Sequence, residues 1–227
     1  MPDAKLTGSS PAKGLLVDAF HSGATEPLAW VEVKVRDLIV TVAADAMKAP
    51  LLGRAGVRLP VTYAETVALC RALDCVAPDV AICDAMFAQA AAPIGYVGLV
   101  KNQDDAKRMR TVDFALRFNE RVEAKIAAHA IAPGALVFGA WKLWITHRAL
   151  AARGAVNYGF WSFSTKPPTP VQTPGSRHDA SHYDYSQLFQ PVKRMARKAD
   201  GGAAIDLLDV FARVDGVPAK FLDAYRT

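Results

Sequence analysis

The run Lys166-Pro167-Pro168-Thr169-Pro170 has three prolines in five residues and constrains this chain more than any other stretch. Proline fixes φ, has no amide proton, and disfavours helical geometry in the residue before it. The run therefore predicts extended chain, which separates an aromatic segment before it from a polar one after it. The polar segment, residues 173–187, carries imidazole, carboxylate, phenol and hydroxyl groups. Because loops carry functional groups more often than cores do, this loop is the candidate site.

Before the prolines, the pattern predicts two strands followed by helices. Residues 30–35 alternate apolar and charged side chains, the period of a half-buried strand, and residues 38–42 form a second apolar run. Thr62 with Glu65 predicts a capping box at the start of a helix, and Asp79 is expected to cap a second helix. These helices should pack as a hairpin against the sheet.

A long amphipathic helix is expected from Asp104 or Asp105 to about Ala130, where Pro133-Gly134 ends it. Residues 50–60, with two prolines and two glycines, are expected to form a loop.

The remaining patterns predict aromatic strands and further helices. Residues 135–138, 141–147 and 155–163 are strand-like, and a helix is expected from Tyr185 or Gln187 through Lys198, followed by two shorter helices. The fold class is therefore α+β, a single domain at residues 29–227 with a small, mostly antiparallel sheet packed against helices. Residues 1–28, rich in Gly, Ser and Ala, are expected to form a flexible N-terminal arm.

The charge balance favours an anionic partner without indicating nucleic acid. The net charge is +5 and the pI is about 9.2, a mild basic excess that suits an acidic or glycan polymer. Nucleic acid is not favoured, since no dense basic tract or stacked aromatic motif accompanies the charge. The basic cluster at residues 193–198 is interpreted as a solvated helix face. The oligomeric state is left open.

Three cysteines, Cys70, Cys75 and Cys83, lie in one apolar segment and indicate a reduced core, not a disulfide framework. Cys83 stands beside Asp84, but a structural role is favoured over a nucleophilic one. No apolar run is long enough to span a membrane, and the N-terminus lacks the pattern of a signal peptide. We therefore expect a soluble protein that is cytoplasmic, or exported by a route not encoded in an N-terminal signal.

The polar loop admits three interpretations. In the first, His178 and His182, with Asp179 or Asp184, bind zinc, although four-residue spacing loses its geometric meaning in a loop. The second is metal-free catalysis, which we favour over zinc, and no cofactor is then expected. In the third, the polar side chains only hold the loop by hydrogen bonds, and His178 lies on the surface.

In the catalytic interpretation, His182 is the general base, because histidine titrates near neutrality. Asp184 or Asp179 orients it, and Ser181, Ser186 or Tyr185 supplies a hydroxyl. Lys142 and His147 are expected to stabilise negative charge if their strand passes under the loop.

The aromatic side chains of Trp141, Tyr158 and Trp161 are candidates for substrate binding by stacking on a sugar or base. Aromatic residues in adjacent strands are, however, more often part of the core.

Several segments resemble a bacterial protein family without an assigned activity. Its motifs correspond to residues 76–84, Gly139-Ala140-Trp141-Lys142-Leu143, Asn157-Tyr158-Gly159-Phe160-Trp161, and His178 followed by His182-Tyr183-Asp184-Tyr185-Ser186-Gln187. The resemblance spans roughly residues 30–194 and is clearest in the last third. It implies that Lys142 and the Tyr-Asp-Tyr-Ser loop form one site. Leu143 stands where the family has Asp, and Gln187 where it has His, so a different or lost activity is open.

Two functions remain after these observations. The first is a hydrolase or lyase that acts on a bacterial cell-envelope polymer such as the peptidoglycan of the cell wall, with the His/Asp/Tyr loop as active site. The catalytic residues are then His182, Asp184, Tyr185, Lys142, His178 and Ser186. The second is a non-catalytic structural or interaction protein of a phage-like particle or secretion apparatus.

Overall fold

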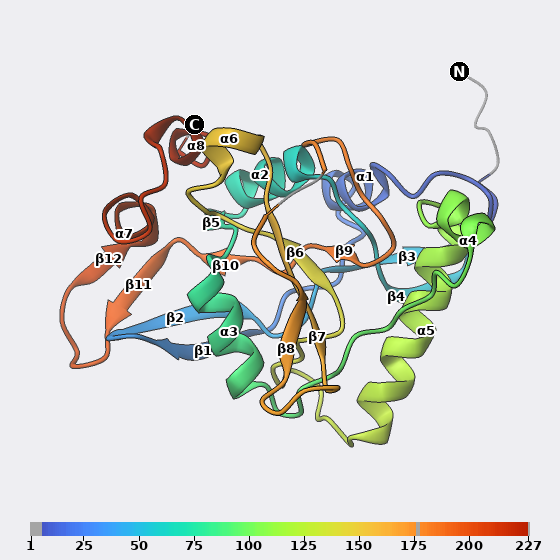
Figure 1. Cartoon of the computed structure of the whole chain (residues 1–227), viewed down its shortest axis with the longest axis horizontal. Helices are drawn as coiled ribbons and strands as arrows, with labels where there is room; N and C mark the ends of the chain where they lie inside the picture. Colours follow the sequence, from blue (N-terminus) through green and yellow to red (C-terminus); the bar gives the residue numbers. More distant parts are fainter. Residues whose placement is uncertain (1–5, 176–177, 227) are drawn as a thin grey trace.

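A computed structural model describes residues 6–175 and 178–226, which form an α+β fold (Figure 1). The predicted fold class is confirmed, and strand pairing is antiparallel except between β6 and β9. The strands are β1 (Trp30–Val35), β2 (Leu38–Ala43), β3 (Lys48–Leu51), β4 (Arg54–Arg58), β5 (Cys75–Val76), β6 (Lys142–Trp144), β7 (Asn157–Ser162), β8 (Thr169–Gln172), β9 (Gln187–Leu188), β10 (Val192–Lys193), β11 (Met195–Lys198) and β12 (Ala204–Asp206). The helices are α1 (Leu15–His21), α2 (Tyr63–Ala72), α3 (Val80–Gln89), α4 (Gln103–Arg108), α5 (Val112–Ala128), α6 (Leu150–Arg153), α7 (Leu207–Arg213) and α8 (Ala219–Asp223).

The strands form three sheets where the sequence predicts one. The largest has the order β12-β11-β2-β10-β5, with β1 also paired to β2; the second has the order β8-β7-β6-β9; β3 and β4 form a hairpin. Figure 1 shows β10 and β11 beside β2, with β12 beyond β11, so the last third of the chain completes a sheet begun near its start.

The predicted helix starts at Thr62 and Asp79 are confirmed. Thr62 and Glu65 form a reciprocal capping box, and Asp79 Oδ1 accepts the amide of Ile82 at 2.7 Å. The two helices contact different strands, α2 packing on β5 and α3 on β1 and β7.

The single helix expected at 104–130 is wrong, because the chain leaves helical geometry between α4 and α5. At this break, the carbonyl oxygens of Met109 and Arg110 accept the amides of Tyr185 and Ala12 at 2.9 Å each. These carbonyls serve other segments, so they cannot continue the helical ladder. The break holds Arg110 beside the polar loop.

The helix expected at 185–198 is also wrong. Pro191 has no amide proton to donate, and the flanking residues pair as β9, β10 and β11, with Val192 opposite both Val42 and Val76. The basic cluster at 193–198 therefore lies on strands, not on a helix face.

The loop expected at 50–60 is instead largely the β3–β4 hairpin. Leu52 and Gly53 form its turn, with φ of 48° and 75°, the pair of positive values that a tight two-residue turn requires.

Residues 11–16 of the N-terminal segment pack against the rest of the chain. Helix α1 buries Leu16, Ala12 is fully buried, and Pro11 bridges to Thr111. Residues 1–5 lie outside the described residues.

The three cysteines are buried and free of disulfides. Burial raises the pKa of the Cys70 and Cys83 thiols well above the ordinary value and that of Cys75 to about 11. At neutral pH they are protonated, in keeping with a structural role.

Candidate functional site

Strand β6 places Lys142 against the end of the polar loop. The Lys142 amide donates to the carbonyl of Ser186 at 2.9 Å, and Lys142 stands opposite Gln187 in the parallel pairing with β9. The loop thus joins the sheet just after Asp184, which brings two segments 42 residues apart together.

Lys142 and Asp184 form a buried ion pair. Lys142 Nζ lies 2.5 Å from Asp184 Oδ2, and the two side chains are only 10% and 6% exposed. The other oxygen, Oδ1, accepts the Ser186 amide at 2.9 Å and the Ser186 hydroxyl at 2.6 Å. Burial alone would raise the pKa of Asp184, but Lys142, His182 and Ser186 hold it well below the usual range. Asp184 is therefore ionised at neutral pH.

His182 lies between this carboxylate and a guanidinium. Its Nδ1 is 3.0 Å from Arg110 Nη2, and its Nε2 is 3.5 Å from Asp184 Oδ2. A guanidinium can only donate, so Nδ1 accepts and Nε2 carries the proton of the neutral ring. The contact to Asp184 is long, and Nε2 has no closer acceptor in the described part of the chain. The two neighbours therefore fix the tautomer, with the proton toward Asp184.

His178 stacks face to face on His182. The ring centroids are 3.5 Å apart and the planes differ by 8°. Burial, then the neighbouring His182 and Lys142, lowers the pKa of His178 below its ordinary value. His178 is therefore largely neutral at pH 7.

The zinc alternative at these two histidines does not fit this geometry. Imidazole lone pairs lie in the ring plane, so parallel stacked rings do not direct them to one point, and Nδ1 of His182 already accepts from Arg110. Nowhere in residues 6–175 and 178–226 do three or more His, Cys, Asp or Glu side chains come together as a metal site.

Tyr185, predicted to be catalytic, points away from the cluster. Its hydroxyl accepts the Leu99 amide at 3.0 Å, and its ring packs between Phe114 and Phe118 of α5. Asp179 accepts the amide and hydroxyl of Ser181, at 2.8 and 2.6 Å, and so holds a turn. Asp184 is thus the carboxylate beside His182.

The predicted aromatic platform is buried. Trp141, Tyr158 and Trp161 are 0%, 4% and 2% exposed. Their polar atoms or ring faces are already engaged: Trp141 donates to Gln190, Tyr158 donates to Asp84, and Trp161 stacks on Phe87. None of the three offers an open face to a substrate here, because adjacent strands turn these rings into the core.

His147 does not join the Lys142–Asp184 cluster. It lines a cavity with Asp79, Asp84, Asp215 and Pro174, and its Nδ1 accepts the Ala149 amide at 3.1 Å.

The residue that sequence reasoning missed is Arg110. It is exposed, and it contacts His182 across 72 residues of sequence. Arg110 lies inside the stretch whose pattern predicts one continuous helix, so the sequence gives no sign that it belongs to the site.

No helix in the described part of the chain is both long and apolar enough to cross a bilayer. Comparison with protein-family models, curated proteins and solved structures finds no match for this chain.

Proposed function

We propose that the protein is a hydrolase or lyase that acts on an acidic polymer of the bacterial cell envelope, such as peptidoglycan, with His182 as general base. The observation that carries this proposal is an imidazole whose Nδ1 faces an exposed guanidinium and whose Nε2 faces an ionised carboxylate. A base needs a fixed tautomer and a partner that stabilises its protonated form. Asp184 supplies both.

Arg110 covers the nitrogen that would act as the base. An acidic group on the substrate would compete for the Arg110 guanidinium and draw its N–H away from Nδ1. The exposed lone pair then takes a proton, either from an attacking water or from a carbon next to the substrate's carboxylate. The imidazolium formed beside Asp184 returns this proton to the leaving oxygen.

The other residues support this role without reacting. Lys142 keeps Asp184 ionised, and the Ser186 hydroxyl donates to Asp184 Oδ1. In hydrolysis the nucleophile is therefore water. The net charge of the site is +1, from Arg110, Lys142 and Asp184. This charge suits an anionic substrate.

The test uses variants that separate chemistry from folding. Asp184→Ala is unsuitable, because it leaves the Lys142 ammonium buried without a counter-charge, at a cost of about 3–5 kcal/mol. His182→Gln and the charge-balanced pair Lys142→Met with Asp184→Asn avoid this. We expect both to slow fragment release from purified peptidoglycan by about 100-fold or more, while the circular dichroism spectrum and melting temperature stay near wild type.

His21→Gln, the same change at an exposed histidine at the end of α1, is the matched control and should keep full activity. Wild-type rates in His182→Gln would refute the assignment. No fragment release by the wild-type protein from any acidic envelope polymer would favour the structural or interaction protein instead.

A further inference from the structure

A cavity of about 310 Å³ lies between the β2–β3 connection, the end of α5 and the segment that follows it. Its wall is largely apolar, with Leu28, Ile126, Ile131 and Val137. Charged side chains, among them Lys48 and Glu123, line it as well. None of the residues of the Lys142–Asp184 cluster lines this cavity.

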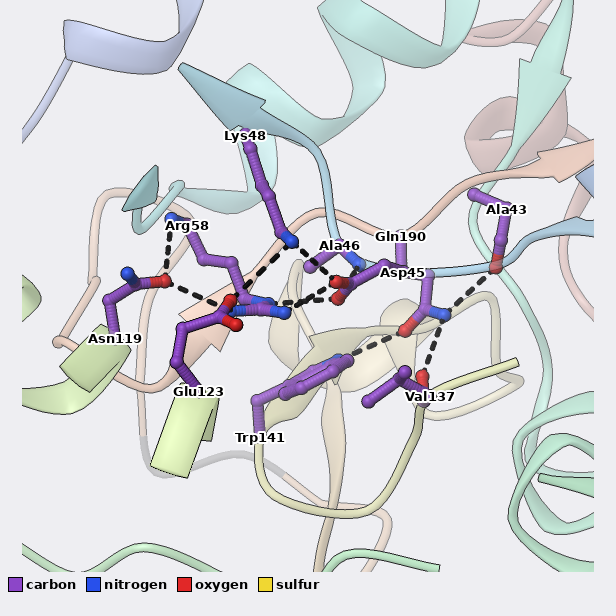
Figure 2. A network of polar contacts seen from close by, with 10 residues as sticks. All are labelled: Ala43, Asp45, Ala46, Lys48, Arg58, Asn119, Glu123, Val137, Trp141 and Gln190. Carbon is purple, nitrogen blue, oxygen red and sulfur yellow. Dashed lines mark hydrogen bonds and ion pairs between the residues drawn. The ribbon is translucent and has the colours of Figure 1, made fainter. Parts of the chain in front are cut away.

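A network of four charged groups underlies the polar part of the cavity (Figure 2). Arg58 is fully buried and donates to both Asp45 and Glu123, and Asn119 accepts from Arg58 Nη1 at 2.9 Å. Lys48 Nζ lies 3.0 Å from Asp45 Oδ2 and 3.5 Å from Glu123 Oε1. Two cations thus converge on two carboxylates, and the network is neutral in itself.

Asp45 has no acceptor capacity left for a ligand. Its Oδ1 accepts the Ala46 amide at 2.7 Å and Arg58 Nε at 2.8 Å, while Oδ2 accepts Arg58 Nη2 and Lys48. Glu123 differs, because Arg58 and Lys48 both contact its Oε1 and its side chain is 45% exposed. The second oxygen of Glu123 is therefore available to a ligand.

Glu26 adds a third carboxylate to the lining. It forms no ion pair with any residue in the described part of the chain. The cavity therefore combines apolar walls with one uncompensated negative charge. An anion would meet that charge, and a purely apolar molecule would leave it without a partner.

We propose that this cavity binds a small organic cation, a primary ammonium on an apolar body. The ammonium donates to the second oxygen of Glu123, the charge of Glu26 at the lining adds to its attraction, and the apolar body lies against Leu28, Ile126, Ile131 and Val137. This site is separate from the proposed active site and does not depend on it.

The test is a calorimetric and NMR titration of the full chain with hexylammonium, hexanol and hexanoate at neutral pH. We expect hexylammonium to bind at least tenfold more tightly than either of the others, with shifts at the amides of residues 28–29, 131–132 and 134–137. Glu123→Gln should weaken hexylammonium tenfold or more. Glu120→Gln, the same change one turn earlier on α5, removes only an exposed pair with Arg54 and should bind as wild type.

Ala135→Phe fills the cavity without touching the charged network, so it should abolish binding even if Glu123→Gln perturbs the fold. Equal affinity for hexylammonium and hexanol, tighter binding of hexanoate, or no binding at millimolar concentration would each overturn the proposal.

Discussion

At the scale of single residues, the candidate site depends on which contacts each polar group makes. His182, Asp184 and Ser186 stand together in a short polar run, so residue types alone mark them as candidates. Lys142 is 42 residues away, so it could be added only on the assumption that its strand passes under the loop, or through the resemblance. Tyr185 belongs to the same run yet faces Phe114 and Phe118, because it lies in a turn that the bond from the Gln187 amide to the Asp184 carbonyl closes.

Asp79, the cap of α3, is buried and changes its protonation on folding. Burial, opposed by the Ile82 amide and reinforced by Asp215, raises the pKa of Asp79 from its ordinary value near 4 to about 7. Between these values the folded state holds a proton that the unfolded state releases. This contribution to stability is complete below pH 4 and is lost as pH rises to 7.

Asp79→Asn keeps a cap at α3 but removes the titration. In urea unfolding, the free energy of unfolding of the variant should rise relative to that of wild type by on the order of 1 kcal/mol per pH unit between pH 5 and 7. Asp37→Asn, at an exposed turn, should show no such gain. Parallel pH profiles for wild type and Asp79→Asn would contradict this role for Asp79.

At the scale of elements, the sequence predicts structure that local chemistry determines, such as helix caps. It does not predict strands that form only through partners far away in the chain. The cap at Thr62 is local chemistry and could be predicted from four residues. Strands β9 and β10 are two residues long and exist through their partners across the sheet, so no periodicity in residues 185–198 could reveal them. The break at Arg110 depends likewise on amides supplied by Ala12 and Tyr185.

The pairing of β6 with β7 gives a prediction at this scale. Gly159 stands opposite Lys142 with φ of 124°, and a Cβ there would lie 2.8 Å from the Trp141 carbonyl oxygen. Gly53, with φ of 75°, has open space around it. Gly53→Ala should therefore cost only backbone strain, about 1 kcal/mol.

Gly159→Ala should cost clearly more, and it should also lower activity because it displaces Lys142. Denaturant unfolding of both variants measures the difference. Equal losses of stability would show that the approach at Gly159 imposes no steric demand.

For the whole molecule, the largest sheet takes strands from residues 30–43, 75–76 and 192–206. The α+β class of the protein can be predicted from the mixture of helical and strand periodicity in the sequence. The division into three sheets cannot, because it depends on pairings between residues far apart in sequence. The same long-range pairing produces two separate features: the His182 cluster beside β6 and β9, and the cavity between α5 and the β2–β3 connection.

We infer that Asp184 and Arg110 hold His182 with Nδ1 as its acceptor nitrogen. Long-range nitrogen–proton NMR correlations of the imidazole rings measure this directly. The arrangement predicts a proton on Nε2 and an unprotonated Nδ1 in His182 at neutral pH, both in wild type and in Arg110→Gln, where Asp184 still holds the ring. A neutral His182 ring with its proton on Nδ1 would contradict it.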